Sequence, residues 1–153
     1  MKNTLCRITG ILALAFLATT EVARAQEPVV ANIPFQFTAG AMTLRAGEYR
    51  VQKERDYSSA LVIRSTDGNG ATMVMTHAAS INAPQAKSKL VFHRYGNRYF
   101  LTQVWSAGSS LGRELPKSAK EKEQALAAHN HASDQVTIVA RLVTSNHYRL
   151  LHK

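Results

Sequence analysis

Cationic and aromatic side chains flank a Gly-Asn pair in the second half of the chain. The candidate binding residues are Arg94, Tyr95, Arg98 and Tyr99, with His93 beside them. An arginine guanidinium can form two parallel hydrogen bonds with a carboxylate or phosphate, and a tyrosine offers a flat amphipathic face to a sugar ring. This pattern predicts a contact surface for an anionic or sugar-like ligand. A purely structural role stays open, because cross-strand Arg and Tyr side chains also stack and stabilise a hairpin.

A β-hairpin from Lys89 to Trp105 must hold these residues. Two runs rich in β-branched and aromatic residues are separated by Gly96-Asn97, and Gly in the first position of a two-residue loop is typical of a type II′ turn. Cross-strand partners in such a hairpin keep a constant index sum. The predicted pairs are Tyr95 with Arg98, Arg94 with Tyr99, Phe92 with Leu101, and Leu90 with Gln103.

The two faces of this hairpin differ in composition. One face carries the apolar residues Leu90, Phe92, Leu101 and Trp105. The other face still holds Val91, Phe100 and Val104, which makes it too apolar to lie wholly in water. We therefore expect a buried central hairpin whose second face is covered by another element.

A Gly-x-Ser-x-Gly pattern occurs from Gly108 to Gly112. In a hydrolase this pattern forms a strained turn between a strand and a helix, and the turn exposes the serine as a nucleophile. Here the sequence Arg-Glu-Leu-Pro follows, which does not start a helix, and the chain lacks the alternating β/α pattern of that fold. We therefore expect Ser110 to be inert.

Several histidines are of the residue type that ligates zinc, copper or nickel. They are His129, His131, His147 and His152. No carboxylate completes a known ligand spacing, and a histidine at a helix end is already favoured by the helix dipole. The sequence therefore predicts no metal site, no cofactor and no catalytic residue.

The first 25 residues have the pattern of an export signal. Lys2 and Arg7 are basic, Ile11 to Ala18 is an apolar run of eight residues, and Ala23-Arg24-Ala25 fits a cleavage site. That run is much shorter than the ~20 residues that span a bilayer. We expect cleavage after Ala25, a periplasmic or extracellular location and no transmembrane span in the mature chain.

The mature chain would be one β-rich domain from residue 26 to 153. Its net charge would be +7, because the signal removes three basic residues and one acidic residue from a total of +9. This balance favours an anionic envelope polymer or a protein partner. The positive residues form no run of like charges, so nucleic acid is not favoured and a plain solvated surface remains an alternative. The only cysteine, Cys6, lies in the signal, so the core must stabilise the fold without a disulfide.

From Pro28 onward the chain reads as short strands separated by turns. Residues 29–38 alternate with a period of two, and Pro34 marks an edge strand or a bend. A last strand is predicted from Gln135 to Val143, and the final ten residues are typical of a frayed terminus. The fold class is mainly β, an antiparallel meander that forms a small sandwich or barrel. The expected inward side chains include Tyr49, Val51, Met73 and Met75.

One helix is predicted, from about residue 118 to 130. Ser118 and Glu121 form a capping box, in which each side chain satisfies a free backbone donor of the other residue. The segment that follows contains strong helix formers and no β-branched residue. Its apolar face consists of little more than Ala119 and Leu126. We expect this helix to pack on the sheet, where it could cover the second face of the hairpin.

Four segments together resemble a family of small, exported, uncharacterised β-rich proteins of soil acidobacteria. They read IPFQF at 33–37, LRAGEYRV at 44–51, FHRYGNRYFL at 92–101 and GRELPKS at 112–118. The resemblance covers most of the mature chain, and its motifs are specific only as a set. It implies a compact β fold and export, and it transfers no catalytic residue.

Two classes of function follow from the sequence. The first is an exported, non-enzymatic β module that binds an envelope component or another anionic partner. The alternative is a carrier of a small apolar ligand inside a β-barrel, with Met73, Met75, Phe92 and Trp105 directed inward. A hydrolase or metal enzyme comes third. A cavity of a few hundred cubic ångströms would distinguish the carrier from a module with a filled core.

Overall fold

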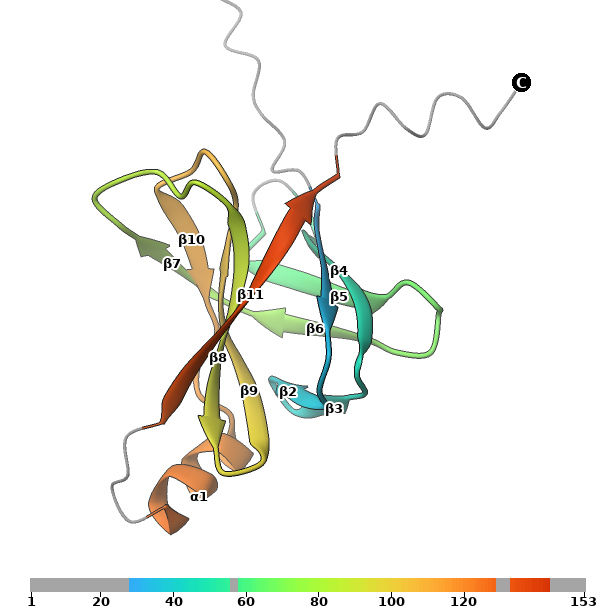
Figure 1. The fold of residues 1–153 in the computed structure, drawn as a ribbon, viewed down its shortest axis with the longest axis vertical. Coiled ribbons are helices and arrows are strands. Elements are labelled where there is room, and N and C mark those ends of the chain that lie inside the picture. Colours follow the sequence, from blue (N-terminus) through green and yellow to red (C-terminus); the bar gives the residue numbers. More distant parts are fainter. Residues whose placement is uncertain (1–27, 56–57, 129–132, 144–153) are drawn as a thin grey trace, which may run out of the picture.

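The computed structural model describes residues 28–55, 58–128 and 133–143, which form a mainly β fold with one helix, as predicted. Figure 1 shows the elements in order. The strands are β1 (Val29–Ile33), β2 (Phe37–Ala39), β3 (Met42–Leu44), β4 (Gly47–Lys53), β5 (Ala60–Ser65), β6 (Ala71–Met75), β7 (His77–Ser80), β8 (Ser88–Tyr95), β9 (Arg98–Trp105), β10 (Leu111–Glu114) and β11 (Asp134–Leu142). The helix is α1 (Ala119–Ala127).

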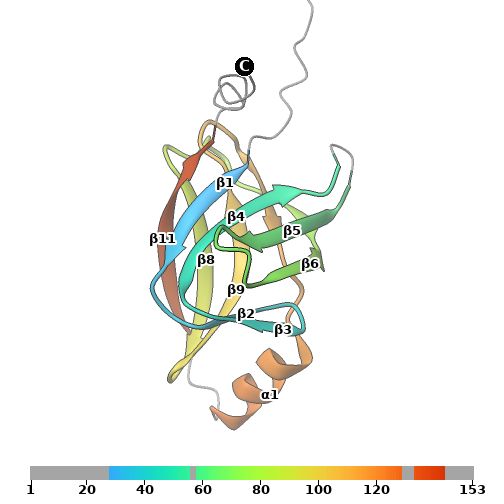
Figure 2. The ribbon, with the colours of Figure 1, turned by 90° about the vertical axis from the view of Figure 1, so that its right-hand side faces the viewer.

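The strands form a nearly closed, barrel-like sheet (Figures 1 and 2). Their order is β3-β2-β9-β8-β11-β1-β4-β5-β6. The chain continues from β6 through Thr76 into β7, which pairs with β10, and β10 pairs with β9. The sheet thus returns to the hairpin through the chain connection between β6 and β7, which do not pair with each other, and it curls into a nearly closed barrel.

The prediction of an antiparallel meander is wrong in two places. Strand β1 lies between β11 and β4, so strands from the two ends of the described chain are neighbours. Strand β2 runs parallel to β9, with Phe37 beside Tyr99. Both pairings join segments far apart in sequence, whereas short turns predict only pairing between consecutive strands.

Pro34 produces a bend, as one of the two alternatives predicted. It is exposed and separates β1 from β2, which pair with different strands. The edge-strand alternative is wrong for β1, since this strand pairs on both sides. The bend redirects β2 toward the tip of the β8–β9 hairpin, where the candidate binding residues lie.

Aromatic rings fill the inner side of the sheet around Phe37. Its ring meets Tyr49 and Phe92 edge-on, with centroids 5.1 and 5.5 Å apart. Such pairs add about 0.5–1.5 kcal/mol each beyond their burial. Tyr49 and Val51 are buried as predicted, and Phe37, Phe92, Ile33, Ile63 and Leu90 are less than 2% exposed.

The β8–β9 hairpin keeps the predicted pairs near its turn and departs from them further away. Gly96 adopts a φ of +59°, which the predicted turn requires. The predicted Leu90–Gln103 pair is wrong, because a β-bulge makes Thr102 an extra residue and Leu90 pairs with Val104. The Thr102 hydroxyl donates a hydrogen bond to the Val91 carbonyl at 3.0 Å.

The bulge also changes which side chains share a face of the hairpin. Val104 belongs to the core cluster with Leu90 and Phe92. Trp105 was predicted on that face, and the prediction is wrong: Trp105 pairs with Lys89, on the second face. An extra residue reverses the side-chain alternation, because successive side chains of a strand point to opposite faces.

Met73 and Met75 point outward, which contradicts their predicted inward position. Their exposed fractions are 59% and 62%, whereas Val74 between them is 6% exposed. The hairpin of β5 and β6 pairs Val74 with the buried Leu61. The turn at 67–70 thus sets a register in which Val74, rather than either methionine, faces the core.

Helix α1 starts where the sequence predicted, and Figure 2 shows it at the end of the barrel near β2 and β3. The Glu121 amide donates to the Ser118 hydroxyl at 3.2 Å. The predicted end at residue 130 lies outside the described residues. The prediction that the helix contacts the sheet through Ala119 and Leu126 is wrong. Ala119 is exposed, Leu126 is 80% exposed, and the buried side chain of the helix is Glu121.

Candidate functional site

The hairpin tip sends its candidate binding residues in different directions. The register pairs Tyr95 with Arg98 and Arg94 with Tyr99, as predicted. The Arg94 guanidinium, however, forms an exposed ion pair with Asp134 of β11, with Nη2 and Oδ2 3.0 Å apart. Its charge is therefore partly neutralised before any ligand arrives.

His93 and Tyr95 meet the buried carboxylate of α1. His93 Nδ1 lies 2.9 Å from Glu121 Oε1, and the Tyr95 hydroxyl donates to the same oxygen at 3.5 Å. The Tyr95 ring also packs edge-on against Phe100. We name this contact of Glu121 with His93 and Tyr95 the helix clasp. It covers part of the second face of the hairpin, which the sequence predicted would be covered.

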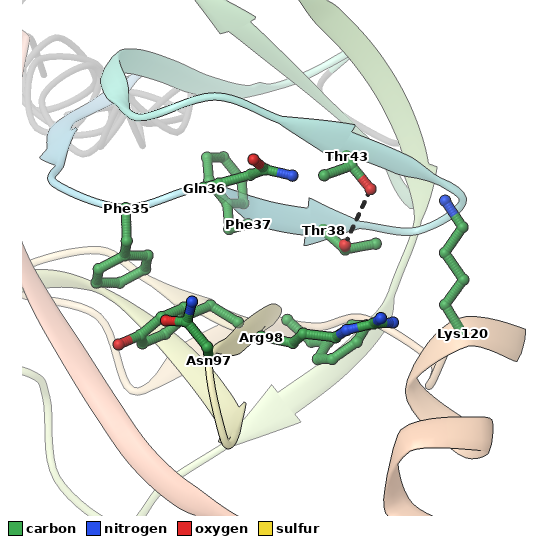
Figure 3. A pocket seen from close by; sticks show the side chains of 10 residues that line it. Phe35, Gln36, Phe37, Thr38, Thr43, Asn97, Arg98 and Lys120 are labelled. Carbon is green, nitrogen blue, oxygen red and sulfur yellow. Dashed lines mark hydrogen bonds between the residues drawn. The ribbon is translucent and has the colours of Figure 1, made fainter.

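The helix clasp gives His93 and Tyr95 a structural role. Glu121 is 2% exposed, and a carboxylate so buried requires hydrogen-bond donors. The neighbouring Lys120 is exposed, and Figure 3 shows its side chain reaching from α1 toward the turn that follows β2. A polar contact thus positions a helix that has almost no apolar face.

Arg98 and Tyr99 stay together at the edge of a pocket of about 460 Å³, which we name the tip pocket (Figure 3). Strand β2 supplies one wall, the hairpin tip a second and α1 a third. This size falls in the range of ligand-binding clefts, roughly 300–1,000 Å³. The polar and aromatic lining residues relevant below are Phe35, Gln36, Asn97, Arg98, Tyr99 and Lys120.

The tip pocket is cationic. Of the described residues that line it, Arg98 and Lys120 are basic and none is acidic. No carboxylate in the described part of the chain forms an ion pair with Arg98, in contrast to Arg94. Among the described residues, Lys120 Nζ bonds only the Ala41 carbonyl, at the long distance of 3.4 Å. Both positive charges are thus available to an anion.

A stacked pair of aromatic rings forms another part of the tip pocket. The rings of Phe35 and Tyr99 lie 3.9 Å apart between centroids, at an interplanar angle of 15°. The Phe35 ring also meets the buried Phe92 ring edge-on at 5.3 Å, which anchors it to the core. The pocket therefore combines a rigid aromatic surface with the amide side chains of Gln36 and Asn97.

Sequence reasoning missed Gln36 and Lys120. Gln36 occupies the outward phase of the alternating segment after Pro34, and Lys120 is in the first turn of the predicted helix, so both were recognisable as exposed. The sequence could not show that they lie near Arg98, because this proximity depends on the parallel β2–β9 pairing and on the helix clasp.

The Gly-x-Ser-x-Gly segment lies in a turn that leads into β10, not into a helix. The Ser109 hydroxyl accepts a hydrogen bond from the Leu111 amide at 3.0 Å, which ties the turn to the strand.

The histidines considered as metal ligands, His129, His131, His147 and His152, lie outside the described residues. Within the described ranges, no three His, Cys, Asp or Glu side chains gather as a metal site.

Comparisons with known proteins give no identity. No family model, curated protein or solved structure matches the chain. The resemblance to exported acidobacterial proteins therefore stays a prediction. Of the helices described, none has the length and apolar character to cross a membrane.

Proposed function

We propose that the mature chain is an exported, non-enzymatic β module that binds an anionic envelope component in the tip pocket. The observation that carries this proposal is the convergence of Arg98 and Lys120 on a pocket without an acidic lining residue. They come from the hairpin and from the helix, which are distant in sequence. Their placement together in a cleft is more specific than a basic overall composition.

The lining favours a carboxylate or phosphate attached to a sugar-like body. The Arg98 guanidinium can form a bidentate pair with the anion, and the Lys120 ammonium adds a second point charge. Hydrogen bonds to charged groups contribute about 1.5–3 kcal/mol each. Gln36 and Asn97 can donate to or accept from hydroxyl groups, and the Phe35–Tyr99 pair offers an aromatic wall.

The test is calorimetric titration of the mature protein with a short oligogalacturonate at two salt concentrations. We expect affinity to fall with salt, and a neutral glucan oligosaccharide of the same length to bind much more weakly. Arg98→Glu with Lys120→Glu should weaken oligogalacturonate binding at least about tenfold, the effect of losing ~1.4 kcal/mol.

A matched control separates the tip pocket from the net charge. Arg64→Glu with Lys122→Glu makes the same change in charge at two exposed residues that do not line the pocket. This control should bind nearly as tightly as the wild type. Equal binding by the wild type and a folded Arg98→Glu, Lys120→Glu variant would falsify the proposal.

The alternative function, a carrier of a small apolar ligand inside the barrel, has less support. Phe37, Phe92 and Leu90 occupy the inner side of the sheet and are less than 2% exposed. The tip pocket lies beside this core, since the buried Phe37 and Phe100 are among its lining residues.

Export itself is a separate part of the proposal. It rests on the basic, apolar and small-residue segments of the first 25 residues. Mass spectrometry of the exported protein should show a mature chain that begins at Gln26. Recovery of a chain that still carries residues 1–25 would contradict both the predicted location and the mature charge of +7.

A further inference from the structure

All three methionines after Met1 gather at a second pocket. Met42 lies on β3 and Met73 and Met75 lie on β6, with exposed fractions of 46%, 59% and 62%. The pocket has a volume of about 590 Å³, and its apolar lining also includes Ala41, Val74, Leu115 and Pro116. We name it the methionine groove. Methionine is normally a buried residue, so three exposed ones at one place require an explanation.

The groove lies where the barrel lacks a strand pair. Among the described strands, β6 pairs with β5 alone and β3 with β2 alone, so each presents a free edge. Figure 2 shows β6 and β3 near each other, with α1 beyond β3. The turn between β2 and β3 contacts β6, since a Cβ at Gly40 would lie 2.9 Å from Val74 Cγ1. Side chains rather than backbone hydrogen bonds bridge this gap.

The methionine groove adjoins the tip pocket. Thr43 and Lys120 line both. The Lys120 ammonium therefore stands between an apolar groove and a cationic, polar pocket. A ligand that bridges both must carry an apolar chain on one side of Lys120 and an anionic group on the other.

We propose that the ligand is an anionic amphiphile, whose carboxylate or phosphate head binds Lys120 and Arg98 and whose alkyl chain lies in the methionine groove. This inference rests on the proposed function and adds the class of ligand. Flexible thioether side chains suit a chain of variable shape, because methionine adapts its packing at low cost. Removal of the exposed apolar surface from water supplies the driving force.

Thioethers also bind soft ions such as Cu(I). The groove is far larger than one coordination sphere, and Leu115 and Pro116 have no side-chain ligand atom. The geometry thus favours an alkyl chain over a metal ion.

The experiment compares hexanoate, octanoate and decanoate as monomers in calorimetric titrations of the mature protein. We expect affinity to increase by about fourfold for each methylene group that enters the groove, which corresponds to ~0.8 kcal/mol. Decyltrimethylammonium, with an alkyl chain as long but a cationic head, should bind at least tenfold more weakly than decanoate. No increase with chain length would overturn the inference.

Two double variants test the groove itself. Met73→Ser with Met75→Ser should abolish the dependence on chain length and leave oligogalacturonate binding unchanged. Met73→Leu with Met75→Leu keeps the apolar surface and removes the sulfur, so the dependence should survive. A wild type that binds Cu(I) and shows no chain-length dependence, with Cu(I) binding lost in the leucine variant, would assign the groove to a soft metal instead.

The outcomes separate this inference from the proposed function. Oligogalacturonate binding without alkanoate binding would overturn the amphiphile and leave the tip pocket in place. Alkanoate binding that is unaffected by Arg98→Glu with Lys120→Glu would show that the head group does not occupy the tip pocket, and the bridging arrangement would be wrong.

Discussion

At the scale of single residues, the packing of the Trp105 ring requires that its cross-strand neighbour, Gly112, has no side chain. The two are partners in the β9–β10 pairing, and both are buried. A Cβ at position 112 would lie 2.5 Å from Cε3 of the indole, closer than any real carbon contact. The glycine is needed here because of close packing.

Gly112→Ala should therefore lower the free energy of unfolding by about 1–3 kcal/mol, the usual cost of overpacking. Urea unfolding followed by circular dichroism measures it. In a Trp105→Leu background the same substitution should cost clearly less, because the clashing ring is gone. An identical cost in both backgrounds would mean that the ring is not the cause.

Asp67, in the turn between β5 and β6, makes the stability of the fold depend on pH. Its carboxylate accepts hydrogen bonds from the Ser65 hydroxyl and from the Asn69 amide, the latter at 2.9 Å. These bonds, with that from Ser65 the larger effect, hold the pKa of Asp67 below its ordinary value of 3.8. Because this pKa is lower in the folded state, the ionised carboxylate stabilises the fold at pH values above the ordinary pKa. This contribution is lost as the pH falls through the lowered pKa of the folded state.

Asp67→Asn keeps an oxygen acceptor in the turn and removes the charge. We expect the variant to be less stable than the wild type at neutral pH, and the difference to shrink as the pH falls below 3.8. Urea unfolding at successive pH values measures it. A difference that is constant across this range would show that the charge has no role.

At the scale of elements, α1 shows what local sequence does and does not determine. Ser118 and the helix formers after it predicted the start of the helix correctly, because a cap is a local interaction. The docking could not be predicted, since it depends on Glu121 meeting His93 and Tyr95 of a distant hairpin. The apolar residues of the helix suggested the wrong contact face.

Ser118→Ala should cost about 1 kcal/mol, because the Glu121 amide loses the oxygen that it bonds. The urea unfolding midpoint reports the loss. Ser118→Asp retains a cap oxygen and should preserve the stability of the wild type. An unchanged midpoint in the alanine variant would mean that this cap does not stabilise the folded chain.

Glu121→Gln tests whether the helix clasp positions Lys120. The amide replaces a buried charged acceptor, so we expect a loss of about 1–3 kcal/mol in unfolding free energy and weaker oligogalacturonate binding. Glu123→Gln removes the same charge from an exposed position on α1 and is the control. If both variants bind the oligosaccharide equally well, the clasp does not contribute to the site.

At the scale of the whole molecule, the strands were more predictable than their partners. Alternating residues and tight turns located most strands, and the hairpin pairs near Gly96 were correct. The parallel β2–β9 pair, the Thr102 bulge and the neighbourhood of β1 and β11 were not predicted. Each depends on contacts between distant segments, which periodicity along one segment does not reveal. For the same reason the sequence located Arg98 and Tyr99 but not the pocket around them.

Because β1 and β11 are adjacent in the sheet, the fold depends on β11, the last strand. Val29 pairs with Leu142, and β11 also pairs with β8 from Asp134 to Ala140. Removal of β11 would leave β1 and β8 with unpaired edges in the middle of the sheet, and Val136 and Ile138 would no longer cover the core. Free edges with exposed apolar residues promote aggregation.

A mature chain that ends at Ser133 should therefore fail to fold cooperatively and should aggregate. A chain that ends at Val143 keeps every pairing of β11, including the bond from the Val143 amide to the Pro28 carbonyl at 3.0 Å, and should unfold like the full chain. Urea unfolding followed by Trp105 emission, together with light scattering, distinguishes the two. A cooperative, monomeric domain without β11 would show that the barrel does not need this strand to close.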